Sequence, residues 1–191
     1  TTINQGGVST LTITLGNPNA TTATLTAGND LVDTLPANVV VATPPALGGT
    51  CSGVKEATAG GTTVTYKAGG TIPANGSCTI TVNVTSAVSG SYVNTIAAGG
   101  LKTNLGDNGA PATASLLVNP GQPPSVSKSF APASIVAGQQ STLTISLGNG
   151  NAAAATLTAD LVDSLPAGVT VANPASIAGT CTLGSVTAVP G

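Results

Sequence analysis

Leucine and isoleucine alternate with hydroxyl-bearing residues in a stretch that occurs twice along this chain. Residues 9–17 read Ser-Thr-Leu-Thr-Ile-Thr-Leu-Gly-Asn, and residues 141–149 read Ser-Thr-Leu-Thr-Ile-Ser-Leu-Gly-Asn. A period of two places the apolar side chains on one face of a strand, and the Gly-Asn pair favours a turn. Each copy therefore predicts a half-buried β-strand that ends in a turn.

The repeat extends well beyond this strand. Residues 31–37 (LVDTLPA) correspond to residues 161–167 (LVDSLPA), and Gly-Thr-Cys at 49–51 returns at 179–181. The offset is 132 residues at the first strand (from 9 to 141) and 130 afterwards (from 31 to 161), and Gly28 with Asn29 accounts for the difference as a loop insertion. A period near 130 residues matches a whole domain rather than one unit of a solenoid.

Further alternating segments predict more strands in the first copy. Residues 78–85 place Cys78, Ile80, Val82 and Val84 on one face and polar side chains on the other. Segments 62–67, 90–97 and 112–118 also read as strands, and clusters of Gly, Asn and Pro separate them. No stretch shows sustained helical periodicity. Many short strands with regular turns indicate all-β sandwiches of antiparallel sheets.

The repeat divides the chain into two expected domains. Residues 1–119 form a first sandwich that lacks its first strand, residues 120–125 form a proline-rich linker, and residues 126–191 form the N-terminal half of a second sandwich. Residue 1 aligns with residue 133, so the strand at 126–130 has no counterpart in the first copy. We expect each defect to be completed by another subunit, because an exposed sheet edge accepts an added strand. The residues predicted to cross between subunits are Val126, Ser127, Lys128, Ser129 and Phe130.

Composition excludes several classes of function. Only 5% of the 191 residues are charged and only four are Lys or Arg, which argues against nucleic-acid binding because phosphates require clustered cations. The 41% of hydrophobic residues argue against disorder, and no apolar run is long enough to cross a membrane. With no His and with Glu56 as the only Glu, acid–base or nucleophilic catalysis has few participants. We therefore expect neither an enzyme nor a cofactor.

The cysteines are the first candidate for chemistry. Cys78 lies on the apolar face of its strand, which favours a buried disulfide with Cys51; two buried thiols are the alternative. Cys181 corresponds to Cys51, and its expected partner lies outside the given sequence. Metal binding at these cysteines is disfavoured because no His or second Cys pair supports it.

Charged side chains offer two further candidates. The Asp-Leu-Val-Asp sequence at 30–33 and at 160–163 is a candidate Ca²⁺ ligand set, although alternation separates its carboxylates, and turn capping is the alternative. Lys67 or Lys128 is a candidate for an isopeptide cross-link to an Asn, which requires a buried Lys beside a carboxylic acid. Alternation places Lys67 on the Thr face of its strand, which disfavours this cross-link.

Sugars are the remaining candidate partner. Residues 19–21, 75–77 and 83–85 match the acceptor pattern for N-linked glycans, although chance matches are expected in a chain this rich in Asn and Thr. Glycan binding by the sandwich loops is disfavoured, because sugar sites usually stack on aromatic rings and only 2% of residues are aromatic.

The motifs together resemble a known family. The segments Phe130-Ala131-Pro132, residues 141–145, residues 161–169 and Gly179-Thr180-Cys181 resemble the "conserved repeat domain" of bacterial surface proteins (domain of unknown function eleven and relatives). In the first copy, residues 72–80 and 90–95 continue the same pattern. The resemblance implies tandem Ig-like sandwiches outside the cell that form stalks, fibres or adhesins.

The two incomplete sandwiches and the family resemblance lead to one functional hypothesis. We expect the structural protomer of an extracellular bacterial fibre that polymerises head to tail by β-strand complementation between subunits. The alternative is a segment of a tandem-repeat cell-surface stalk or adhesin whose ligand-binding tip lies elsewhere.

Overall fold

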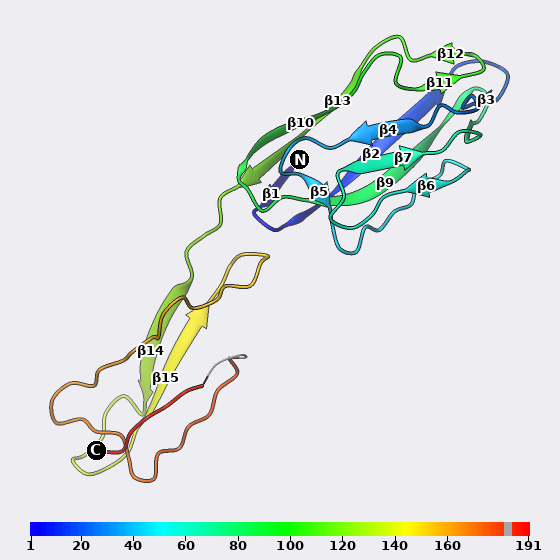
Figure 1. Ribbon diagram of the computed structural model, residues 1–191. Helices are drawn as coiled ribbons and strands as arrows, with labels where there is room; N and C mark the ends of the chain where they lie inside the picture. The colour runs from blue at the N-terminus through cyan, green and yellow to red at the C-terminus, as the bar shows by residue number, and fades with distance from the viewer. Residues whose placement is uncertain (182–184) are drawn as a thin grey trace. The chain divides into compact units, whose positions relative to one another are not determined.

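The computed structural model describes residues 1–181 and 185–191. All of the regular secondary structure within these residues is β-strand. The chain divides into two compact domains (Figure 1). The first contains residues 1–123 and 149–154, and the second contains residues 124–148 and 155–191. The all-β sandwich class predicted from the sequence is confirmed.

The first domain contains short strands around two long ones. Its strands are β1 (Thr2–Asn4), β2 (Val8–Asn17), β3 (Ala23–Thr24), β4 (Leu31–Thr34), β5 (Val40–Val41), β6 (Lys55–Glu56), β7 (Thr63–Tyr66), β8 (Thr71–Ile72), β9 (Gly76–Thr85), β10 (Gly90–Ile96), β11 (Lys102–Thr103), β12 (Gly106–Asp107) and β13 (Ala112–Asn119).

Two groups of these strands form the layers of the sandwich. In one layer β9 lies between β2 and β5 and pairs antiparallel with both. In the other, β10 pairs antiparallel with β13, and β1 runs parallel to the end of β13. β4 packs beside β10 and pairs with β7, which also pairs with β6 (Figure 1). Two small ribbons, β3 with β8 and β11 with β12, complete the domain.

The core lies between the layers and follows the alternation of the sequence. Cys78, Ile80, Val82 and Val84 of β9 are all buried, whereas the polar residues between them are partly exposed, as predicted. Tyr66 is the one aromatic side chain in the buried core of the described residues. The other core residues are Ile13, Leu15, Ala23, Leu25, Leu31, Leu35, Val39, Val41, Cys51, Val64 and Ile72.

The turn after the repeated strand has the same form in both copies. The buried Asn17 donates from Nδ2 to the carbonyl oxygen of Thr21 at 2.8 Å and accepts from the backbone N–H of Asn19 at 3.1 Å. Asn149 makes the corresponding bonds to Ala153 at 2.8 Å and from Asn151 at 3.1 Å. The Gly-Asn signal therefore marks an Asn-stabilised turn.

The second domain contains one hairpin. β14 (Ser125–Ala131) pairs antiparallel with β15 (Thr142–Gly148), so β14 begins inside the predicted linker 120–125. Residues 161–164 and 170–171 correspond to β4 and β5 but form no strand. In the first domain β4 pairs with β7 and β5 with β9, and the counterparts of β7 and β9 would fall beyond residue 191.

Candidate docking site for a β-strand

The strand β2 forms an open edge in the first domain. It pairs with β9 along its whole length, and within the described residues no strand pairs with its other side. The unpaired N–H and C=O groups of such an edge are a template for an added strand. In the second domain the equivalent strand β15 is also paired along its length, but with β14.

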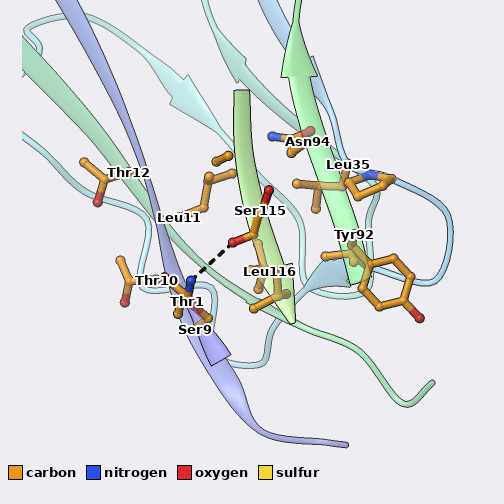
Figure 2. A pocket seen from close by; sticks show the side chains of 14 residues that line it. Thr1, Ser9, Thr10, Leu11, Thr12, Leu35, Tyr92, Asn94, Ser115 and Leu116 are labelled. Carbon is orange, nitrogen blue, oxygen red and sulfur yellow. Dashed lines mark hydrogen bonds between the residues drawn. The ribbon is translucent and has the colours of Figure 1, made fainter. Parts of the chain in front are cut away.

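A groove lies beside the open edge of β2 (Figure 2). Its volume is about 320 Å³, and its walls come from β2, β9, β10, β13 and the loop after β4. The amino group of Thr1 lies in the groove and donates to the carbonyl oxygen of Ser115 at 3.3 Å. The lining residues are Thr1, Ser9, Thr10, Leu11, Thr12, Leu35, Pro36, Val39, Val84, Tyr92, Asn94, Ala114, Ser115 and Leu116.

A buried carboxylate is bonded to a carboxamide in the wall of this groove. Asp33 on β4 is fully buried, and its Oδ2 accepts a hydrogen bond of 2.7 Å from Nδ2 of Asn94 on β10. Asp33 Oδ1 and Asn94 Oδ1 are also shielded from solvent, and neither has a hydrogen-bond partner in the described part of the chain. Burial raises the pKa of the Asp33 carboxyl, and the hydrogen bond from Asn94 opposes that rise.

The second domain places a lysine at the corresponding carboxylate. Nζ of Lys128 on β14 lies 2.7 Å from Oδ1 of Asp163, which is the counterpart of Asp33. Asp163 Oδ2 is buried without a hydrogen-bond partner among the described residues. Lys128 and Asp163 also line a shallow pocket together with Val126 and Ile145.

The two domains thus hold different parts of one three-residue arrangement. The first has Asp33 and Asn94, and the counterpart of Lys128 would precede residue 1. The second has Lys128 and Asp163, and the counterpart of Asn94 would follow residue 191. A strand like β14 on the edge of β2 would bring a lysine to Asp33 and Asn94.

The pair Asp33–Asn94 was missed by sequence reasoning, although a signal was present. Asn94 alternates in phase with Tyr92 and Ile96, and Asp33 alternates in phase with Leu31 and Leu35, so both polar residues occupy inward positions. A polar residue at an inward position requires a partner.

The cysteines form a disulfide in the first domain. Sγ of Cys51 and Sγ of Cys78 are 2.05 Å apart, and both residues are buried. Cys181 is exposed and is in no disulfide among the described residues.

The candidate Ca²⁺ ligands do not come together. Alternation buries Asp33, whereas Asp30 Oδ2 lies 2.9 Å from Nζ of Lys67, which also lies 3.4 Å from Glu56 Oε2. Within the described residues no group of three or more His, Cys, Asp or Glu side chains is placed to hold a metal ion. Hydrogen bonds from the Ala68 N–H and from Lys67 lower the pKa of Asp30.

The glycan acceptor motifs lie in different settings. Asn19 is exposed beside the Asn17 turn, and Asn75 has a positive φ of 47° in the turn before β9. Asn83 on β9 accepts a hydrogen bond of 2.9 Å from the hydroxyl of Thr10.

The described residues contain no helix that could span a membrane.

The fold is that of a two-domain, all-β, sandwich-like protein with an open strand edge at β2 of its first domain. Residues 1–118 and 124–191 each match the family described as Domain of unknown function (DUF7933), and the chain belongs to this family. Comparisons with curated proteins and with solved structures found no match.

Proposed function

We propose that this chain is a structural subunit of an extracellular fibre, in which β14 of one copy completes the first domain of the next. The observation that carries the proposal is the contrast between the two copies of the repeated strand. β15 is paired with β14, whereas β2, which is paired with β9, has no counterpart of β14 and has an open edge beside a groove.

The register of the second domain defines how the added strand fits. Phe130 pairs with Leu143 and Lys128 with Ile145, so the offset of 132 places them opposite Leu11 and Ile13 of β2. Residues directly opposite each other in a sheet share a face. Phe130 would therefore enter the groove beside Leu11, where the 41% of its surface that is exposed in its own domain would be removed from water.

The donor strand is weakly held in its own domain. Every residue of β14 is exposed, and Phe130 retains 41% of its accessible surface. A two-stranded sheet alone is marginally stable in water. Transfer of β14 from β15 to β2 exchanges one nearly identical edge for another and adds the contacts of the groove. An open head-to-tail contact of this kind generates filaments.

The disulfide supports an extracellular location, because such bonds persist in oxidising compartments. The scarcity of charge is compatible with a polymer surface made of Thr, Ser and Asn, on which surface glycans are candidate attachments.

Light scattering after size-exclusion chromatography, followed by electron microscopy, tests the proposal. We expect oligomers that grow with concentration into regular fibres, and we expect a synthetic peptide of residues 124–132 to shorten them by capping β2. A scrambled peptide should have no effect. Phe130→Ala should weaken assembly at least about tenfold, which is the equivalent of about 1.4 kcal/mol. Val136→Ala, at a residue of the same domain that is 76% exposed, is the matched control.

A second function is favoured by the tandem family match, which covers both copies of the repeat. In this alternative the chain is part of a monomeric cell-surface stalk or adhesin, and the strand that completes each sandwich comes from the same polypeptide. Monomers at every concentration, with no binding of the 124–132 peptide, would reject subunit exchange and favour the stalk.

A further inference from the structure

Two buried oxygen atoms in the first domain have no hydrogen-bond partner among the described residues. Asp33 Oδ1 and Asn94 Oδ1 are both shielded from water without a hydrogen bond within the described residues. A buried polar atom left unpaired costs about 1–3 kcal/mol. Asn94 also lines the groove beside β2 (Figure 2), and its Nδ2 is bonded to Asp33, so a side chain entering the groove meets the carboxamide of this pair.

The register of the docked strand supplies that side chain. Lys128 would lie opposite Ile13, on the inward face. In the second domain the same lysine reaches the corresponding carboxylate at 2.7 Å, which shows that its length suits the gap. Lys128 of a second copy would therefore place its amine against the carboxyl of Asp33 and the carboxamide of Asn94.

We propose that Lys128 of one copy forms an amide bond with Asn94 of the next, so that the fibre junction becomes covalent. This inference rests on the proposed function. Lys128 first passes a proton to Asp33, and the neutral amine then attacks Cγ of Asn94. The new Nζ–Cγ bond forms as the Cγ–Nδ2 bond breaks. Asp33 gives its proton to Nδ2, which leaves as ammonia, and takes up the second proton that Nζ loses as the amide forms, so that Asp33 ends protonated and no atom changes oxidation state.

The surroundings of Asp33 suit this role. Its carboxyl already contacts the nitrogen that leaves, through the hydrogen bond of 2.7 Å from Asn94 Nδ2. Full burial raises the pKa of Asp33, so the carboxyl readily holds the proton of the lysine. Holding the amine and the carboxamide side by side in the groove would replace a bimolecular encounter. The product also removes the buried charge of the lysine.

Intact mass under denaturing conditions is the direct test. We expect oligomers that survive boiling in detergent, each lighter than the sum of its chains by one ammonia per junction. The four lysines make the position of the bond readable by trypsin. A peptide of residues 103–191, uncleaved after Lys128, should be joined to the peptide of residues 68–102, which contains Asn94.

Three variants separate the chemistry from assembly. Lys128→Arg keeps the charge but lacks the nucleophilic amine, and Asp33→Asn keeps the shape but lacks the carboxyl; both should abolish the denaturant-resistant species. Lys128→Arg should still form oligomers under native conditions. Lys102→Arg, at an exposed lysine of the first domain, should behave as the wild type.

The possible outcomes distinguish this inference from the proposed function. Native oligomers that dissolve completely in detergent, with full cleavage after Lys128, would overturn the covalent bond and leave strand complementation intact. Monomers that have lost one ammonia would overturn donation by a second copy. The absence of oligomers under native conditions would reject both.

Discussion

Removal of the Cys51–Cys78 disulfide should destabilise the first domain by several kcal/mol. The bridge joins residues separated by 27 positions. In the chain-entropy model a loop of this length contributes about 3.5 kcal/mol by constraining the unfolded state. Both cysteines are buried, so replacement by Ala adds a small packing cost. The double variant Cys51→Ala/Cys78→Ala should therefore lose a large part of the stability that is typical of a single domain.

Urea denaturation of the wild type and the double variant measures this loss. A slope of about 1.5–2 kcal/mol per molar converts 3.5 kcal/mol into a midpoint shift of about 2 M. Both proteins should carry Cys181→Ser, because that exposed thiol would otherwise exchange with the disulfide. A loss below about 1 kcal/mol would refute the loop-entropy reasoning. Reduction of the wild type provides an independent measurement without mutation.

Three further predictions concern buried polar and tight positions in the first domain. Tyr66→Phe should lower the free energy of unfolding by about 1–3 kcal/mol, because the buried hydroxyl donates to the carbonyl oxygens of Ser52 and Thr71. Tyr92→Phe removes a more exposed hydroxyl and should lower it less in the same denaturation assay. Gly49→Ala should lower the melting temperature strongly, because at φ +100° the added Cβ would lie 2.2 Å from the carbonyl oxygen of Thr79. Gly28→Ala is the control: its Cβ would meet no atom within 4 Å, so that only the positive φ destabilises the variant. The raised pKa of Asp33 means that the folded state binds that proton more tightly than the unfolded state, so stability should fall as pH rises from the ordinary aspartate range through the raised pKa. Asp33→Asn should reduce this fall in stability, measured by melting curves from about pH 4 to about pH 8. The lowered pKa of Asp30 has the opposite effect on stability, because its contribution is lost as the pH falls.

Local pattern was enough to predict the longest strands of the first domain, β2, β9, β10 and β13. The alternation of residues 78–85 gives β9 and its buried face, because period two is a property of each strand alone. The Gly-Asn pairs likewise predict both turns, because the Asn side chain bonds to backbone within four residues.

Contacts between distant segments could not be predicted in the same way. Asp33 and Asn94 are 61 positions apart, and alternation shows only that each points inward. Their meeting depends on β4 packing beside β10, which is a property of the sheet order. The salt bridge from Lys128 to Asp163 similarly spans 35 positions. In the second domain, alternation also could not show that residues 161–164 stay unpaired, because pairing requires a partner strand.

The lysine–aspartate–asparagine arrangement is best understood together with the small core. The core of the described first domain is aliphatic apart from Tyr66, and hydrophobic burial contributes in proportion to area. A covalent tie stabilises independently of the size of the core, because it acts on the freedom of the unfolded chain. The disulfide connects Cys78 of β9 to the loop that contains Cys51, within one subunit. The proposed amide bond would connect β14 to β10 across the junction, which is the place where pulling on a fibre would otherwise separate two strands.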